Sequence, residues 1–277
     1  MDWSDEVAAD YRSRIILDPG NPILACRANS YRYLRLDRPE YAGLPRLGSC
    51  CSSDALVWNV FRSLHKARLL HIICNMFEIG KLRSLLIWGL APRMDGVSTE
   101  LQYIVGTLVR SFDGVLPEPL AYPDIILLGT EAVAVIECGL PGKDIPSSKL
   151  WHMPLEYAAE RLPLYLGVEP LLVENPVKNG EVAGIFKLVR SAFYGVQLAR
   201  KMNTEAVIVA LAPATVWRKK QRNTRVNALS EWRLFNRMVN PEALRKIRLS
   251  WQDIRASISG RVPLGDLIKY LDSHPCL

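Results

Sequence analysis

Two carboxylates stand at the outer ends of two neighbouring apolar segments in the middle of the chain. Asp124 precedes the apolar run 125–128, and Glu137 closes the run 132–136 that follows a Gly129-Thr130 turn. Apolar runs joined by a short connection containing Gly are typical of a β-hairpin. The first strand of a hairpin starts beside the end of the second, so we expect both acids at one end of a sheet. Two carboxylates at one strand end make a site for a hard divalent cation such as Mg2+, which takes oxygen ligands and keeps several waters.

The residue two positions after Glu137 also bears on the chemistry. Side chains alternate along a strand, so positions 137 and 139 face the same way. A lysine at position 139 would point at whatever Glu137 holds, but the residue there is Gly139, and the next lysine is Lys143. The long side chain of Lys143 tolerates displacement and could swing toward the acids. The alternative is that Lys143 is a solvent-exposed loop residue.

The order Pro123-Asp124, spacer, Glu137 resembles the motif of the PD-(D/E)xK nuclease superfamily of metal-dependent phosphodiesterases. The resemblance extends over positions 50 to 212. Ser53-Asp54-Ala55, leading into Trp58-Asn59-Val60-Phe61, resembles the acid-bearing first helix of that superfamily. Leu150-Trp151 and the run from Arg161 to Tyr165 resemble the segment after the active-site strand in a bacterial restriction-endonuclease-like group. The chain departs from the motif at Gly139, where the superfamily has lysine, and this departure concerns catalysis more than fold.

The resemblance implies a Mg2+-dependent (or Mn2+-dependent) nuclease that hydrolyses phosphodiester bonds of DNA, in defence or repair. In this interpretation Asp124 and Glu137 bind the metal directly, and the backbone carbonyl of Cys138 is the third oxygen. Asp54 would be the outer acid that orients a metal-bound water, and Lys143 would take the place of the missing strand lysine. Polar residues on a later helix resemble those that some members aim at the site; they are Gln197, Tyr194 and Lys187.

Each acid also has an ordinary structural interpretation. An aspartate between a proline and a strand often makes a turn, which would account for Asp124. Glu137 at a strand end would simply be solvated, and Asp54 near a helix start is favoured by the helix dipole. If Asp54 pointed away from the other acids, Glu100 would be the next candidate. Gly139 favours a rival function, an inactive nuclease-fold module that binds nucleic acid or a protein partner; a third interpretation is an interaction protein with no nucleic-acid role.

The overall charge is consistent with a polyanionic partner. The chain has 277 residues, of which 49% are hydrophobic and 23% charged, and a formal net charge of +7. This composition is that of a folded globular protein, and the positive charge favours phosphate contacts, although ordinary solubility explains it as well. A basic run follows the apolar segment 206–212, and its cations could track a nucleic-acid backbone with Trp217 available for stacking. The run consists of Arg218, Lys219, Lys220, Arg222 and Arg225. The alternative is a solvated loop.

The cysteines and apolar runs limit the remaining classes. Six cysteines occur without any C-x-x-C pair, and the four histidines are scattered, so a zinc site is not indicated. With no apolar signal segment at the N-terminus, we expect free thiols in a reducing cytoplasm. No apolar run reaches the length that spans a bilayer, so a membrane partner is not expected. The sequence leaves open whether the chain forms a homo-oligomer.

The pattern of the elements predicts an α/β fold with a mixed central sheet flanked by helices, restriction-endonuclease-like. A strand, a long helix and a second strand at 132–137, 181–202 and 206–212 are typical of a βαβ unit. The apolar run 84–90 predicts a further strand, and because it is apolar on both faces we expect it to be central. The other helices are predicted near 54–64, 69–77, 99–109, 153–161, 227–238, 254–258 and 264–271, and a short strand is predicted at 171–173. Residues 1–48 are expected to form an irregular or partly helical N-terminal arm, and residues 49–277 the nuclease-like α/β domain.

Overall fold

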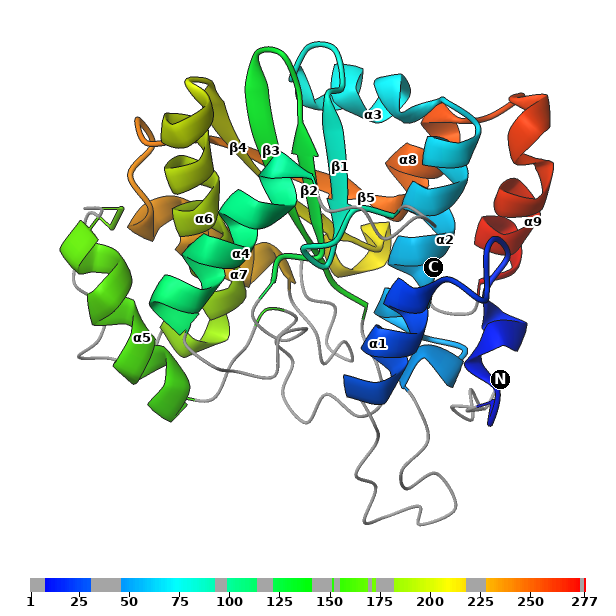
Figure 1. Ribbon diagram of the computed structural model, residues 1–277, viewed down its shortest axis with the longest axis horizontal. Helices are drawn as coiled ribbons and strands as arrows, with labels where there is room; N and C mark the ends of the chain where they lie inside the picture. Colours follow the sequence, from blue (N-terminus) through cyan, green and yellow to red (C-terminus); the bar gives the residue numbers. More distant parts are fainter. Residues whose placement is uncertain are drawn as a thin grey trace.

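The computed structural model places a twisted sheet at the centre of the molecule, with helices on both of its faces (Figure 1). It describes residues 8–30, 46–92, 99–113, 122–140, 151, 155–168, 171–172, 182–217, 228–274 and 277. The strands are β1 (Ser84–Ile87), β2 (Ile125–Leu128), β3 (Ala132–Cys138), β4 (Glu205–Ala212) and β5 (Arg245–Ser250). The α-helices are α1 (Pro22–Ser30), α2 (Ser53–Lys66), α3 (Leu70–Phe77), α4 (Glu100–Asp113), α5 (Leu155–Val168), α6 (Phe186–Met202), α7 (Ala228–Met238), α8 (Trp251–Ser257) and α9 (Gly265–Ser273). Short 3-10 helices are η1 (Tyr11–Arg14), η3 (Arg46–Gly48), η6 (Val182–Gly184), η7 (Ala214–Trp217) and η8 (Val262–Leu264).

The strand order is β1-β2-β3-β4-β5, and the sheet is mixed. The pairs β1–β2 and β2–β3 are antiparallel, whereas β3–β4 and β4–β5 are parallel. Helix α6 connects β3 to β4, and α7 connects β4 to β5. The predicted α/β class, mixed sheet and βαβ unit are therefore confirmed.

Two predictions about strands are wrong. β1 is an edge strand rather than a central one. Its apolar pattern arises because both of its faces are covered: Leu85 and Ile87 join one core layer and Leu86 the other. β5 was not predicted, because Arg245, Lys246 and Arg248 interrupt its apolar residues.

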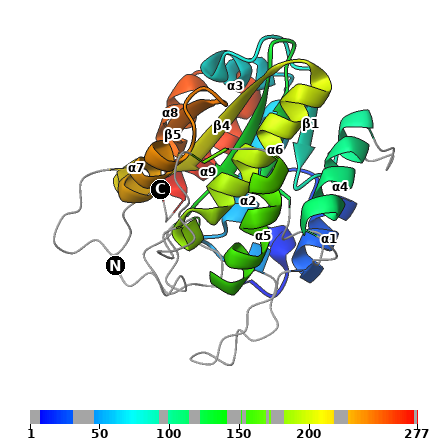
Figure 2. The ribbon, with the colours of Figure 1, turned by 90° about the vertical axis from the view of Figure 1, so that its left-hand side faces the viewer.

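The two faces of the sheet carry separate core layers. One layer contains Val133 and Val135 of β3 and is closed by α4, α5, α6 and α7. The other contains Ala134 and Ile136 and is closed by α1, α2, α3, α8 and α9. Figure 2 shows α6 lying along β4 on the first face. The strict alternation along β3 places Glu137 on the α6 side, in phase with Val133 and Val135.

The described parts of the segment 1–48 belong to the second core layer. Leu24 and Leu47 are fully or almost fully buried there. Two side chains of α2 hold the segment by hydrogen bonds: Trp58 Nε1 donates to the carbonyl of Leu17 at 2.8 Å, and Asn59 Nδ2 donates to the carbonyl of Arg14 at 2.9 Å. The partly helical character expected of this segment takes the form of η1, α1 and η3, which pack against α2.

Most of the described thiols are free, as expected. Cys26, Cys50, Cys74 and Cys138 form no disulfide. The expectation is wrong for Cys51, which is disulfide-bonded. Among the residues that the structure describes, no helix is long and apolar enough to cross a membrane.

The turn between β2 and β3 is fixed by a close approach of the backbone. A Cβ atom on Gly129 would lie 1.9 Å from the carbonyl oxygen of Ile79. The Gly129 amide donates to Ala132 O at 2.9 Å, and the Glu131 amide donates to Ile79 O at 3.1 Å. Glycine is required here because any side chain would displace the Ile79 segment. The register of the hairpin, and hence the position of its far end, depends on this contact.

We predict that Gly129→Ala lowers the free energy of unfolding by about 1–3 kcal/mol, the usual cost of forcing extra atoms into a packed site. Urea unfolding followed by circular dichroism measures it. The matched control is Gly167→Ala in α5, where an added Cβ would meet nothing within 4 Å. That control should be neutral or stabilising by up to about 1 kcal/mol, since alanine is the better helix former. Equal effects of the two substitutions would contradict the packing argument.

Candidate active site

Asp124 and Glu137 lie side by side at one end of the β2–β3 hairpin. Ile125 pairs with Ile136, so the residue before β2 is adjacent to the penultimate residue of β3. Asp124 Oδ2 accepts a hydrogen bond from the Cys138 amide at 2.8 Å, which fixes the carboxylate across the strand ends. Glu137 is only 2% exposed, and the Asp124 side chain is 15% exposed. The sequence-based expectation that the two acids share one end of the sheet is therefore confirmed.

Asp54 reaches the same place from α2. Ser52 caps this helix by accepting a hydrogen bond from the Ala55 amide at 3.1 Å, which fixes Asp54 in the first turn. Its carboxylate accepts two hydrogen bonds from Arg27, from Nε at 3.0 Å and from Nη2 at 2.9 Å. The same Nη2 lies 3.8 Å from Asp124 Oδ1. Asp54 thus faces Asp124 through Arg27, whereas Glu100 is exposed on α4.

Arg27 of α1 is a site residue that the sequence did not indicate. Its guanidinium lies 4.8 Å from the centre of the Trp88 ring, which in turn stacks on Trp58 with centroids 6.2 Å apart. Trp88 has a positive φ of 49°, rare for an aromatic residue, and its amide donates to the Asp124 carbonyl at 3.0 Å. Strained backbone of this kind persists only where the surroundings hold it, and it is frequent at functional sites.

Helix α6 contributes the groups that face Glu137. Ser191 Oγ donates a hydrogen bond to Glu137 Oε1. Arg190 is 1% exposed, and its charge lowers the pKa of Glu137. Lys187, one turn earlier and partly exposed, lowers the pKa of both Glu137 and Asp124. Among the described cations, Lys187 is therefore the one that lowers the pKa of both carboxylates of the hairpin.

A buried aspartate with three tyrosines stands behind Arg190. Tyr157 Oη donates to Asp113 Oδ1 at 2.8 Å, Tyr165 donates to the same oxygen, and Tyr194 donates to Oδ2. Asp113 is fully buried at the end of α4. Burial lowers the pKa of Arg190, but the charges of Glu137 and Asp113 outweigh burial and raise it. The charge of Arg190 therefore acts on both Asp113 and Glu137.

The carboxyl groups of the hairpin are in an environment that disfavours their charge. Burial and then the charge of Asp124 raise the pKa of Glu137 to about 7, against opposing contributions from Arg190 and Lys187. Burial also raises the pKa of Asp124, although Arg27 and Lys187 act in the other direction. Two desolvated acids next to each other are stabilised when a proton or a cation neutralises part of their charge.

The balance of charged side chains also indicates that a proton or a cation stabilises these acids. Among the described residues the cluster holds four acids, Asp54, Asp113, Asp124 and Glu137, and three bases, Arg27, Lys187 and Arg190. These leave one surplus negative charge when all are ionised. The surplus is neutralised when Glu137 keeps its proton, which its raised pKa favours near neutral pH, or when one further cation binds.

The donor atoms suit a hard metal ion in type. Asp124 and Glu137 offer carboxylate oxygens, and Mg2+ is commonly held by one or two carboxylates together with waters and substrate phosphates. Within the described ranges no group of three or more His, Cys, Asp or Glu side chains is arranged to hold a metal. Burial and the neighbouring acids raise the pKa of the Cys138 thiol, so its sulfur stays protonated and only its carbonyl oxygen remains as a ligand.

The other predicted site residues stand as follows. Lys143 and the basic run of Arg218, Lys219, Lys220, Arg222 and Arg225 lie outside the described residues. Trp217, proposed for base stacking, stacks on Trp151 at 5.6 Å, lies 5.5 Å from the Arg248 guanidinium and donates through Nε1 to Leu249 O at 2.9 Å. Its ring is therefore engaged within the fold. Gln197 lies further along α6, on the helix that carries Lys187.

Searches against protein family models, curated proteins and solved structures gave no match. The function is therefore inferred from the geometry and chemistry of the site.

We predict that ionisation of Glu137 destabilises the fold as the pH rises. Its pKa is about 7 in the folded protein and about 4.5, the ordinary value, in the unfolded chain. The folded-state pKa is the higher of the two. Protonated Glu137 therefore makes its full contribution to the free energy of unfolding below pH 4.5, and this contribution is lost as the pH rises toward 7. Relative to Glu137→Gln, the wild type should lose on the order of 3 kcal/mol of unfolding free energy across this window.

Urea titrations at several pH values between 4 and 8 test this prediction. The control is Glu156→Gln, which alters an exposed residue of α5 and should leave the pH dependence of the wild type unchanged. A constant difference between wild type and Glu137→Gln across the window would show that Glu137 titrates normally.

Proposed function

We propose that this protein is a metal-dependent nuclease of PD-(D/E)xK type that hydrolyses phosphodiester bonds of DNA, on a restriction-endonuclease-like variant of its α/β fold. The carrying observation is the convergence of Asp54, Asp124 and Glu137 at one end of the β2–β3 hairpin. An acid-bearing helix beside an antiparallel hairpin with two acids is the arrangement that the sequence resemblance implies. Defence or repair in the cytoplasm is the setting that we propose for such an activity.

Asp124 and Glu137 would hold Mg2+ or Mn2+, with the Cys138 carbonyl as a further oxygen. The bound ion would supply Lewis acidity and lower the pKa of a water. The raised pKa of Glu137 supports a cationic ligand, because binding a cation relieves the repulsion between two desolvated acids. Asp54 would orient a water at the edge of the site.

Lys187 is the candidate for the role of the motif lysine. Gly139 has no side chain, whereas the charge of Lys187 on α6 acts on both carboxylates and lowers the pKa of each. An ammonium group at this position would stabilise an attacking hydroxide and the charge that develops on the phosphate. The proposed substrate is DNA, which the net charge of +7 favours.

The second candidate function is a catalytically inactive nuclease-fold module that binds nucleic acid or a protein partner. Two observations favour it. Position 139 lacks a lysine, and Arg27 bridges Asp54 and Asp124 with its guanidinium, where it competes with a metal ion for Asp124.

Cleavage assays decide whether the acids are catalytic. We expect nicking of plasmid DNA or cleavage of single-stranded DNA in Mg2+ or Mn2+ and none in EDTA, with a loss of more than about 100-fold in Asp124→Asn, larger than the usual effect of an indirect ligand. The matched control, Asp266→Asn, changes an aspartate of α9 whose side chain is 83% exposed, and it should keep full activity. DNA binding without cleavage in any metal would support the inactive module instead.

A second set of variants tests Lys187. Lys187→Met should reduce cleavage by about 100-fold or more, the range of a lost charge-stabilising group. The control is Lys201→Met, on the exposed end of the same helix, with no expected effect. Gly139→Lys in the Lys187→Met background should restore part of the rate, since it puts the ammonium group on the strand. Full activity of Lys187→Met would exclude this residue from the reaction.

A third experiment asks whether Arg27 competes with the metal. Arg27→Gln leaves Asp54, whose side chain is only 13% exposed, without its ion-pair partner. The melting temperature in EDTA should therefore fall, consistent with a loss of up to about 3–5 kcal/mol, the cost of breaking a fully buried pair. Mg2+ or Mn2+ should then raise the melting temperature of the variant more than that of the wild type. The control, Arg255→Gln, removes an exposed ion pair with Asp272 and should leave the metal response unchanged. An equal metal response in Arg27→Gln and wild type would mean that Arg27 and the ion do not share a site.

A further inference from the structure

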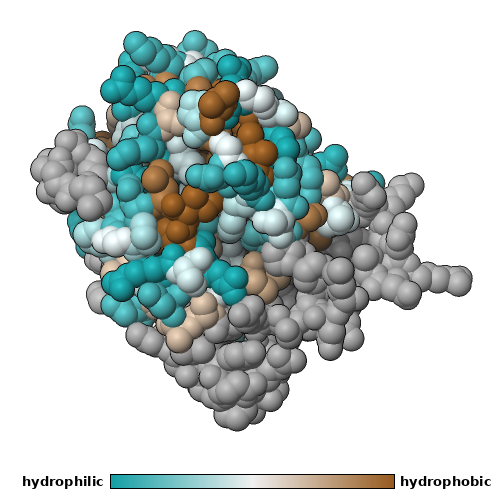
Figure 3. Space-filling model, turned by 90° about the vertical axis from the view of Figure 1, so that its right-hand side faces the viewer, coloured by the Kyte–Doolittle hydropathy of each residue, from teal (hydrophilic) through white to brown (hydrophobic). Residues whose placement is uncertain are grey.

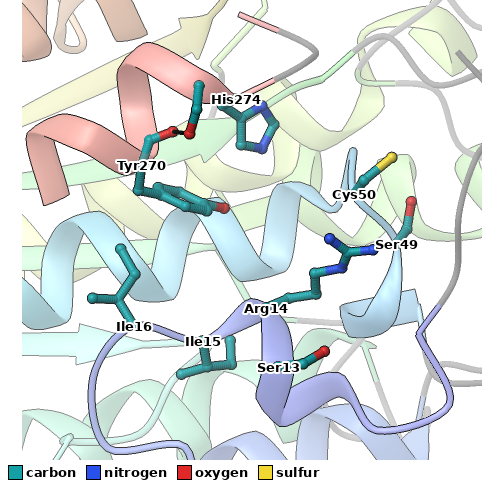
Figure 4. Close-up of a pocket in the computed structure, with 9 residues that line it drawn as sticks. Ser13, Arg14, Ile15, Ile16, Ser49, Cys50, Tyr270 and His274 are labelled. Carbon is teal, nitrogen blue, oxygen red and sulfur yellow. Dashed lines mark hydrogen bonds between the residues drawn. The ribbon is translucent and has the colours of Figure 1, made fainter. Parts of the chain in front are cut away.

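A separate cavity of about 260 Å³ opens between η1, the segment before α2 and α9 (Figure 4). Its walls include Arg14, Ser49, Cys50, Tyr270 and His274, and none of the residues of the acidic site line it. In Figure 4 the Arg14 guanidinium, the Tyr270 hydroxyl and the His274 ring point toward a common space. The volume lies just below the range of about 300–1,000 Å³ typical for drug-sized ligands, so it suits a small one.

The described lining of the cavity carries a cation and no acid. Arg14 is its cation, and no Asp or Glu is among the described residues that line it. Burial lowers the pKa of His274 to about 4, so this imidazole is uncharged at neutral pH. A small anion is therefore the ligand class that the charge favours.

The hydroxyl groups around the cavity divide into two kinds. Ser13 donates to the carbonyl of Asp10 at 2.9 Å, and Ser273 donates to the carbonyl of Tyr270 at 3.2 Å, so both protons are committed to the backbone. Ser49 Oγ instead accepts from the Cys51 amide at 3.2 Å, which leaves its proton as a donor.

Tyr270 is the second hydroxyl donor. Burial raises the pKa of its phenol to about 12, although Asn59 and Arg14 act in the opposite direction, so the hydroxyl keeps its proton at neutral pH. With Arg14 and Ser49, donors from three separate elements, η1, the segment before α2 and α9, surround one space.

The position of Arg14 is fixed before any ligand binds. Asn59 is completely buried in α2. It donates to the Arg14 carbonyl at 2.9 Å and accepts from the Ile16 amide at 2.9 Å. These two bonds hold the end of η1 against α2, which lowers the entropy cost of placing the guanidinium.

We propose that this cavity binds a phosphate monoester through Arg14, Ser49 and Tyr270. A phosphate presents three acceptor oxygens in a tetrahedral arrangement, and arginine pairs with it through two parallel hydrogen bonds. Such a group comes from a free nucleotide or from the terminal phosphate of a nucleic-acid strand. The site is independent of the acidic cluster, and the proposal does not require the nuclease function.

Calorimetric titrations in EDTA test the site with three probes: inorganic phosphate, thymidine 5′-monophosphate, and a short oligothymidine with or without a 5′-phosphate. We expect binding that Arg14→Gln weakens ~10-fold or more and Tyr270→Phe weakens ~5-fold, as for charged and neutral hydrogen bonds respectively. Arg12→Gln, two residues away and exposed, is the matched control and should bind as the wild type does.

The probes separate the two sources of phosphate. A preference for the 5′-phosphorylated over the 5′-hydroxyl oligonucleotide that disappears in Arg14→Gln supports a strand end as ligand. Binding of the monophosphate without that preference supports a free nucleotide. The proposal is overturned if no phosphate probe binds the wild type, or if both Arg14→Gln and Tyr270→Phe, with unfolding midpoints near that of the wild type, bind as tightly as it does.

Discussion

The structure depends on the burial of carboxylates at the end of the β2–β3 hairpin. Taking Asp124 and Glu137 out of water is costly unless positive charges and hydrogen bonds compensate. The compensation comes from elements far apart in the sequence: Arg27 from α1, and Lys187, Arg190 and Ser191 from α6. Because these helices lie on opposite faces of the sheet, the two acids tie both core layers to one point. The incomplete balance of charge at that point is also what makes it a candidate for chemistry.

Arg190 is itself held by a second buried group. Asp113 is 0% exposed and accepts hydrogen bonds from the hydroxyls of Tyr157, Tyr165 and Tyr194. Buried polar networks of this kind stabilise one arrangement strongly when every member is satisfied. Asp113 raises the pKa of Arg190, and the charge of Arg190 in turn lowers the pKa of Glu137. Residues that touch neither the proposed metal nor the proposed substrate set the electrostatics of the site.

The sequence was sufficient to predict most of the elements, β5 excepted, but not the way their charges are paired. The hairpin, α2 and α6 were predictable because alternation and helical spacing are local properties of the chain. Asp124 and Glu137 followed from their positions at the ends of the hairpin strands, and Asp54 from the resemblance of its helix to that of the nuclease superfamily. Arg27 and Asp113 did not, because their partners are distant: 27 residues separate Arg27 from Asp54, and 81 separate Asp113 from Tyr194. The prediction of β1 as a central strand was wrong for a related reason. Apolar residues on both faces of a strand show that both faces of the sheet are covered, and they do not show that the strand has a neighbour on each side.

The stacking of Arg27 on Trp88 gives the site an optical signal of its own. The indole of Trp88 stacks on Trp58 and lies 4.8 Å from a guanidinium that also contacts both Asp54 and Asp124. The emission of a buried indole depends on the electric field across its ring, and the neighbouring guanidinium contributes to that field. Any event that moves Arg27 off the ring, such as arrival of another cation, changes the fluorescence of Trp88 directly. If a cation binds at the proposed metal site, the contribution of Trp88 to the intrinsic fluorescence of the unlabelled protein would therefore change.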